Sequence, residues 1–180
     1  MTSIYFHEDD FCQIEILPVE NLAFCLKQAG RITEFADEHR EGVGFSHMYM
    51  REDASASLRS KKILAADLKN LLMGILPEFD EIYTGYGRYR ETCEFTNAFG
   101  QNENVVLFYE QEAEFVKNIW LKLEVGNSTD IESAMGIFGV LSQMGEFLIA
   151  DWEWGFVEVL KNVGSVMDYL EELMRAFNSR

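Results

Sequence analysis

The fold is decided by residues 146–177, which read EFLIADWEWGFVEVLKNVGSVMDYLEELMRAF. Two short apolar runs, residues 147–150 and 156–160, are separated by the residues DWEWG, and this pattern predicts two adjacent strands. Apolar side chains then recur at steps of three and four residues, the spacing of one helical face, at Val163, Val166, Met167, Leu170, Leu173, Met174 and Phe177. That face needs a cover, so we expect the helix to pack on a sheet that contains both strands.

Strand candidates make up much of the chain before this stretch. Residues 4–6 and 11–17 are rich in β-branched and aromatic side chains and predict an opening hairpin. A further strand is expected at residues 45–50. Four more candidates follow one another and predict an antiparallel meander, at residues 82–89, 92–99, 104–109 and 115–125.

Three more helices are expected from apolar stripes and boundary signals. Two of them cover residues 19–39 and 63–75, and Pro77 ends the second because proline cannot continue the hydrogen-bond ladder. Thr129 and Glu132 have the spacing of a capping box, so the third helix should begin at Thr129.

The order of these elements indicates the fold class. Runs of neighbouring strands interrupted by helices are typical of an α+β fold, here a largely antiparallel sheet with about four helices packed on it. A chain of 180 residues can bury a core without disulfides or metals, so we expect a single domain over residues 1–180.

The sequence also indicates a compartment. No apolar run approaches the roughly 18 residues that span a bilayer, and the first residues have neither a basic start nor a long apolar segment. We therefore expect a cytoplasmic protein without a membrane segment. Cys12, Cys25 and Cys93 are odd in number and far apart, which favours three reduced thiols in the core over disulfides or a metal site.

Charge is the strongest global signal. The net charge is −16, and residues 91–180 carry 5 basic and 16 acidic side chains against 10 and 15 in residues 1–90. Such a surface repels a phosphate backbone, so nucleic acid is a poor partner, whereas a basic protein would be attracted faster by the same field. The alternative is that the excess charge serves solubility alone.

The densest group of ionisable side chains is His7, Glu8, Asp9 and Asp10. A metal-dependent enzyme could use these residues, with His47 as a further ligand. The spacing matches no calcium loop, and no HExxH or paired Cys/His motif is present. Aspartates are also common turn residues, so we favour a solvated turn over a metal or catalytic site.

A basic patch interrupts the acidic sequence at residues 85–90, GYGRYR. It begins like a dinucleotide-binding fingerprint but has Arg90 where the final glycine should stand, and no clear helix follows. Arg88 and Arg90 could clamp an anionic small molecule, which would suit a regulatory domain. We favour the simpler interpretation, in which both arginines pair with neighbouring carboxylates.

The remaining candidate is the segment Asp151, Trp152, Glu153 and Trp154. If it is extended, both indoles point to the same side of the strand. They would be core if covered, whereas at an exposed strand connection they would form aromatic anchors among acids, suited to a basic protein partner. No nucleophile motif or phosphate-binding loop is present, so the sequence predicts no catalytic, cofactor-binding or metal-ligating residues.

The last 35 or so residues resemble the ends of small bacterial immunity proteins from toxin–immunity systems. The resemblance lies in an apolar run, Asp151-Trp152, a short turn, a second run that ends at Leu160, and a helix with Tyr169-Leu170. It implies a protein that binds and neutralises a basic, nuclease-type toxin, and it implies no particular binding residues. The leading hypothesis is therefore an acidic, non-enzymatic binding protein without cofactors, while its partner and oligomeric state stay open.

Overall fold

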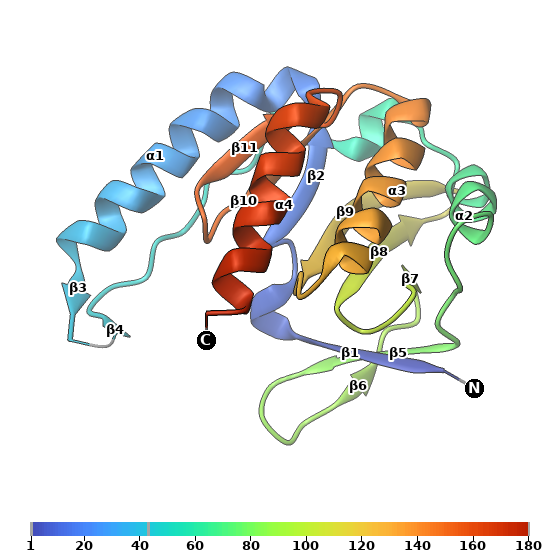
Figure 1. Cartoon of the computed structure of the whole chain (residues 1–180), viewed down its shortest axis with the longest axis horizontal. Helices are drawn as coiled ribbons and strands as arrows, with labels where there is room; N and C mark the ends of the chain where they lie inside the picture. The colour runs from blue at the N-terminus through green and yellow to red at the C-terminus, as the bar shows by residue number, and fades with distance from the viewer. Residues whose placement is uncertain (1, 43, 180) are drawn as a thin grey trace.

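The computed structural model describes residues 2–42 and 44–179. Its centre is a six-stranded sheet in the order β11-β10-β2-β9-β8-β7, in which every neighbouring pair is antiparallel (Figure 1). The strands are β2 (Ile14–Pro18), β7 (Thr96–Phe99), β8 (Val105–Glu112), β9 (Phe115–Leu123), β10 (Phe147–Asp151) and β11 (Phe156–Val159). This sheet, with helices packed on it, makes the protein an α+β fold, as the sequence predicts.

The strands predicted from residues 146–177 are confirmed. β10 and β11 lie side by side with Leu148 opposite Val159. Three strands of the predicted meander are present as β7, β8 and β9, but its first strand, predicted at residues 82–89, pairs with other strands in a separate small sheet. The first strand of the sheet, β2, lies between β10 and β9, so residues far apart in the sequence share the centre of the sheet (Figure 1).

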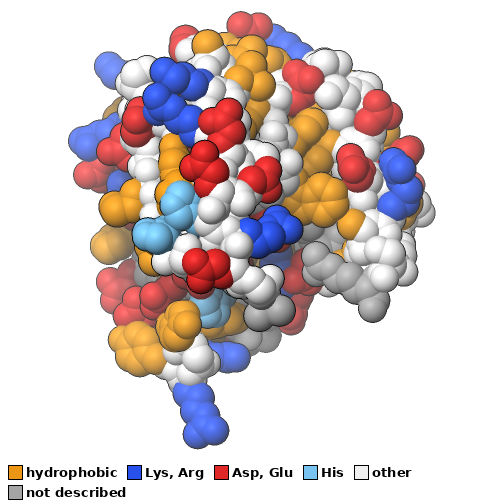
Figure 2. Space-filling model, turned by 90° about the vertical axis from the view of Figure 1, so that its left-hand side faces the viewer, with side chains coloured by type: hydrophobic (Ala, Val, Ile, Leu, Met, Phe, Trp, Pro, Cys, Tyr) orange, Lys and Arg blue, Asp and Glu red, His pale blue; other side chains and the backbone are white. Residues whose placement is uncertain are grey.

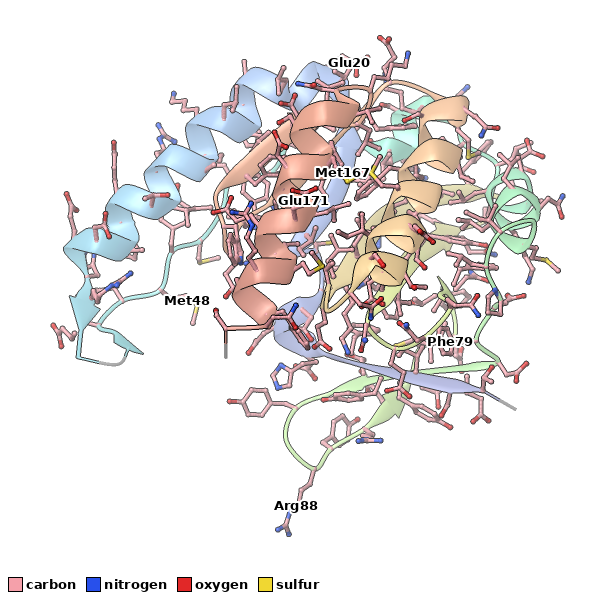
Figure 3. The ribbon with its side chains drawn as sticks, in the orientation of Figure 1. Glu20, Met48, Phe79, Arg88, Met167 and Glu171 are labelled. Atoms are coloured by element: carbon pink, nitrogen blue, oxygen red, sulfur yellow. The ribbon has the colours of Figure 1, made fainter. Side chains whose placement is uncertain are left out.

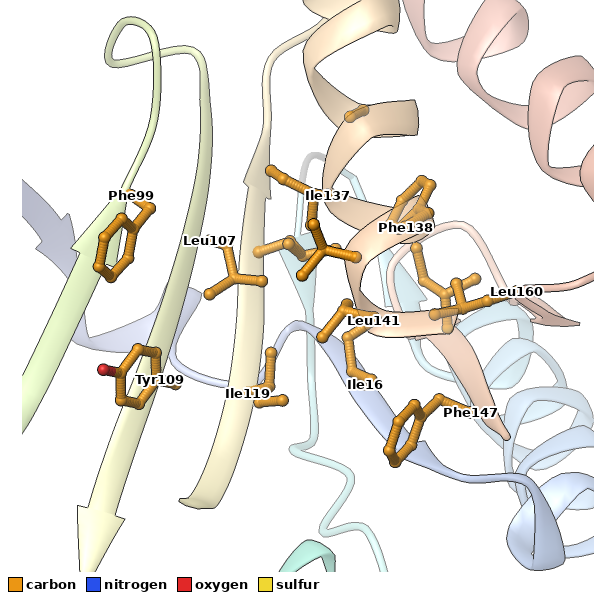
Figure 4. Packing of buried hydrophobic residues seen from close by; sticks show 14 of the residues in the cluster. Ile16, Phe99, Leu107, Tyr109, Ile119, Ile137, Phe138, Leu141, Phe147 and Leu160 are labelled. Atoms are coloured by element: carbon orange, nitrogen blue, oxygen red, sulfur yellow. The ribbon is translucent and has the colours of Figure 1, made fainter. Parts of the chain in front are cut away.

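One face of the sheet is covered by three helices, α2 (Ala65–Met73), α3 (Ser128–Met144) and α4 (Val163–Phe177). The core between them contains Ile16, Leu107, Ile119, Phe138 and Leu141, all at most 2% exposed (Figure 4). Burying each such side chain contributes about 1.5–3 kcal/mol. The predicted role of the last helix is therefore confirmed: α4 covers a sheet that contains β10 and β11.

The opposite face has two separate covers. Helix α1 (Leu22–Glu38) lies over β10 and β11, where Cys25 contacts the cluster that includes Leu148. At the other end lies a small sheet of β1 (Ser3–His7), β5 (Glu81–Gly85) and β6 (Glu91–Thr92), in which Phe6 packs edge-on against Phe108 and Trp120. The central sheet is thus covered on both faces toward each end, while the side chains of its edge strand β11 are half-buried.

The predicted opening hairpin is wrong. β1 and β2 are both strands, but β1 pairs in parallel with β5, and β2 pairs with β10 and β9. The short 3-10 helix η1 (Glu8–Asp10) and the left-handed backbone of Cys12, at φ 54°, turn the chain from one sheet to the other. The sequence pattern shows which side chains share a face, but long-range packing selects the neighbouring strand.

The predicted strand at residues 45–50 is also largely wrong. Only β4 (Gly44–Phe45) is a strand, paired with β3 (Arg40–Glu41) in a hairpin beyond α1. Met48 and Met50 are 87% and 84% exposed, since no neighbouring sheet covers them. Figure 3 shows Met48 on the connection that runs back from this hairpin.

Helix α3 begins one residue before the predicted start and has a different cap. The side chain of Asn127 accepts hydrogen bonds from the backbone N–H groups of Thr129 and Asp130, at 2.9 and 3.2 Å. Thr129 therefore lies inside the helix, and the predicted capping box is wrong. Asp130 is 1% exposed, and its buried carboxylate accepts a hydrogen bond from the Gly126 N–H at 3.0 Å.

Two further 3-10 helices complete the described elements, η2 (Val19–Asn21) before α1 and η3 (Leu58–Lys61) before α2. Helices α1 and α2 lie within the predicted ranges. Across residues 2–42 and 44–179, none of the helices combines the length and apolar character that a membrane crossing requires.

Candidate functional site

The segment that joins β10 to β11 is a tight turn, so its two tryptophans diverge. Trp152 is 5% exposed and lies under α1 with Cys25 and Ala29. Trp154 is 39% exposed and lies beside the end of α4, at a hollow that Phe177 also lines. The segment is a turn rather than an extended strand, so the condition under which both indoles would share one strand face is not met.

Asp151 holds this turn in place. One carboxylate oxygen accepts hydrogen bonds from the N–H groups of Glu153 and Trp154, at 3.0 and 3.1 Å, and the other accepts from the Tyr169 hydroxyl at 2.6 Å. Burial raises the pKa of Asp151, although these hydrogen bonds oppose the shift. Asp151 and Trp152 are buried, so of the four predicted contact residues only Glu153 and Trp154 lie at the surface.

We define the acidic groove as the hollow between Trp154 and Phe177, with Asp10, Glu124 and Glu153 at its rim. Its volume is about 200 Å³, and Leu173 of α4 and strand β9 line it as well. The two aromatic side chains are 39% and 40% exposed. The groove brings together two segments that the sequence marks separately, the His7–Asp10 turn and the turn after β10.

The chemistry of the acidic groove favours a cationic side chain. Lys122 is the one base among its described lining residues, and its ammonium lies 3.5 Å from the Glu124 carboxylate. A lysine or arginine from a partner could stack on Trp154 while it faces Asp10 and Glu153. The hollow is smaller than the roughly 300–1,000 Å³ of small-molecule sites, so it suits one inserted side chain better than a metabolite.

The His7–Asp10 cluster forms a turn closed by its own hydrogen bonds. The His7 ring nitrogen accepts from the Asp9 N–H at 3.2 Å, and the Asp10 carboxylate accepts from the His7 N–H at 3.1 Å. Glu8, Asp9 and Asp10 are exposed. Within the described part of the chain, no three His, Cys, Asp or Glu side chains converge as metal ligands. His47, the further ligand considered, contacts another histidine near the end of α1, His39, with ring centres 4.7 Å apart.

Arg88 and Arg90 do not converge on one position. The Arg90 guanidinium lies over the Tyr5 ring, 4.6 Å from its centre. Arg88 extends away from the fold between β5 and β6 (Figure 3). Neither arginine forms an ion pair with the carboxylates described in residues 2–42 and 44–179, so the expected pairing is not found there.

A charged cluster that the sequence did not predict lies beneath α1. The Trp152 indole N–H donates to Glu15 at 2.7 Å, and the Arg51 guanidinium donates to the same carboxylate oxygen at 3.0 Å. Arg51 also lies over the Trp152 ring, 4.8 Å from its centre. Burial raises the pKa of Glu15, and burial together with Glu15 raises the pKa of the Cys12 thiol to about 12.

In the sequence Glu15 stands between Ile14 and Ile16, and this alternation indicates that its side chain faces away from the main core. The same alternation occurs in a strand whose second face is open to solvent and in one whose second face is covered by a helix, so it did not reveal that α1 covers Glu15. Phe177 was recognised as part of the helical stripe, but its position beside the turn after β10 follows only from the folded chain.

Comparisons of the chain with protein-family models, with curated proteins and with solved structures find no match.

Proposed function

We propose that this protein is an acidic, non-enzymatic binding protein that holds a basic protein partner at the acidic groove. The observation that carries the proposal is the groove itself, in which two half-exposed aromatic rings lie within a rim of Asp10, Glu124 and Glu153. Aromatic anchors of this kind supply much of the binding energy in protein interfaces. The proposal assigns no catalytic residue and no cofactor to the chain.

The charge of the whole chain supports a basic partner. The net charge is −16, and acidic side chains are spread over the face shown in Figure 2 rather than confined to one patch. A field of this sign attracts a basic protein from a distance and raises the rate of encounter. The exposed acids of the groove then orient the partner at close range.

Short-range contacts at the groove supply most of the binding free energy. A partner lysine or arginine placed over Trp154 gains a cation–π contact, worth about 0.5–2 kcal/mol as water is excluded. Its aliphatic stem can cover the Phe177 ring, since long basic side chains bury their stems on apolar surface. Asp151 and Tyr169 hold the Trp154 turn beforehand, which lowers the entropic cost of binding.

The resemblance of the last 35 or so residues to immunity proteins supplies the class of partner. A nuclease-type toxin carries a basic surface to bind its nucleic acid substrate, and that surface is complementary to a strongly acidic chain. We propose that the protein neutralises such a toxin by occupying this surface.

The test uses immobilised deca-lysine as a defined basic probe and deca-glutamate as its acidic counterpart. We expect deca-lysine alone to bind, with an association rate that falls as salt is added. Glu153→Gln should slow association and flatten its salt dependence, since it removes one rim charge. Trp154→Ala should speed dissociation about thirtyfold, the equivalent of about 2 kcal/mol.

Matched controls separate the groove from generic attraction. Phe95 is 65% exposed and lies before β7, so Phe95→Ala removes an exposed aromatic ring outside the groove. Glu34→Gln removes one exposed charge from α1. Equal dissociation rates for Trp154→Ala and Phe95→Ala would contradict the groove as the binding site, and equal binding of deca-glutamate would contradict the basic partner.

A further inference from the structure

A second cavity lies on the α1 side of the central sheet, between α1, β2, β9 and the connection that carries Arg51. Its volume is about 530 Å³, within the range of about 300–1,000 Å³ that small-molecule sites occupy. Leu17, Phe24 and Leu58 provide apolar wall, and the charged cluster of Glu15, Arg51 and Trp152 forms one side. This cavity is separate from the acidic groove, with which it shares no lining residue.

The basic groups of the cavity already have acidic partners. Arg51 donates to Glu15 at 3.0 Å, and the Lys117 ammonium lies 3.2 Å from Glu110. Asp53 has no ion pair or hydrogen bond with any described residue, and only one of the two Glu15 carboxylate oxygens accepts hydrogen bonds. The charged groups of the cavity wall that remain free to bind a ligand are therefore carboxylates.

An amide donor also lines the cavity. Gln28 of α1 is 1% exposed, and its side-chain oxygen accepts from the Tyr49 hydroxyl at 2.9 Å. Its amide nitrogen has no partner among the described residues. This nitrogen is an amide donor on the cavity wall, so an oxygen acceptor placed in the cavity would receive its hydrogen.

Lys117 reaches the cavity wall through an irregularity in β9. The pairing with β8 shifts between Glu110 and Gln111, which lie opposite Asn118 and Val116, so Lys117 is an extra residue of a bulge. Bulges redirect side chains and are common beside binding sites. Glu110 holds this bulge, because it also accepts from the Asn118 amide at 2.7 Å.

We propose that this cavity binds a small molecule that joins a protonated amine to an oxygen acceptor, the chemistry of a free amino acid. The amine lies against Glu15 and Asp53, and the acceptor takes the Gln28 amide hydrogen. A simple cation satisfies only the first of these groups and a simple carboxylate only the second. The ligand that carries both groups binds best.

Three probes of similar length separate these features. L-lysine carries the amine and the carboxylate, cadaverine carries amines alone, and hexanoate carries the carboxylate alone. Calorimetric titration should give the order lysine, cadaverine, hexanoate, with lysine at least about tenfold tighter than cadaverine. A ligand that binds only the folded state also raises Tm, so lysine should give the largest thermal shift.

Two variants assign the contacts. Asp53→Asn, at an exposed position, should weaken lysine and cadaverine alike by about tenfold. Gln28→Met keeps an unbranched side chain but removes the amide donor, so lysine should no longer bind more tightly than cadaverine. Asp168→Asn, on the exposed side of α4, is the control and should change neither affinity.

Two results would overturn the proposal. One is the absence of any lysine-dependent heat and thermal shift in the unmodified protein. The other is an Asp53→Asn variant that binds lysine as tightly as Asp168→Asn does. Because Asp53 is exposed, its substitution gives this answer even where Gln28→Met reduces folding stability.

Discussion

Trp152 and Trp154 are two residues apart, yet their replacement should have very different effects on stability. Trp152 is 5% exposed, packs under α1, and donates its indole N–H to Glu15 at 2.7 Å. Trp152→Ala should therefore lower the free energy of unfolding by about 3–5 kcal/mol, the usual cost of removing a large core aromatic. Trp154 is 39% exposed, so Trp154→Ala should cost about 1 kcal/mol or less.

Urea unfolding followed by circular dichroism measures both changes. The variants should share the slope m and differ in midpoint, since the same surface is exposed when each unfolds. Trp152→Phe separates the two contributions of the indole, because it keeps an aromatic ring but leaves Glu15 without one hydrogen bond. We expect it to cost about 1–3 kcal/mol. Equal costs for Trp152→Ala and Trp154→Ala would refute the assignment of one ring to the core and one to the groove.

Three further predictions concern the cap, the buried carboxylate and the thiols. Asn127→Ala should lower the free energy of unfolding by about 0.5–2 kcal/mol and Thr129→Ala by clearly less; the reverse order in urea melts would restore the capping box. Burial raises the folded-state pKa of Asp151 above 3.8, so the folded chain holds this proton more tightly, and its contribution to stability falls as pH rises through the raised pKa. Asp151→Asn has no titrating carboxyl at this position, so its free energy of unfolding should rise relative to that of the unmodified protein between pH 3.5 and 7 in urea melts. A difference that stays constant with pH would contradict this. Cys12 and Cys25 have thiol pKa values raised to about 12, so iodoacetamide at pH 8 should label them far more slowly in the folded chain than in urea, and equal rates would contradict these raised pKa values.

Local patterns predicted the elements better than their partners. The helical stripe of residues 163–177 and the paired runs before it were recognisable because each pattern repeats over several residues. β1 was also recognisable as a strand, but its parallel pairing with β5 depends on residues nearly 80 positions away. At residues 45–50 a strand was predicted where almost none forms, because the exposed Met48 and Met50 have no sheet to join beyond the short β4.

The candidate site was predictable only in part. Glu153 and Trp154 were named from the sequence, because aromatics among acids stand out by composition. Phe177 and Glu124 complete the acidic groove only because α4 and β9 end beside the same turn. Trp152 carries the same sequence signal as Trp154, and the covering helix α1 decides that it is buried.

The position of β2 has a consequence for how the chain folds during synthesis. β2 ends at Pro18 and its neighbour β10 begins at Phe147, so the centre of the sheet stays incomplete until nearly the whole chain has been made. At about 5–20 residues per second, the intervening residues take roughly 6–26 s to synthesise. Pairings of such long sequence separation form slowly, so the edge of β2 that pairs with β10 remains open to other contacts throughout that interval.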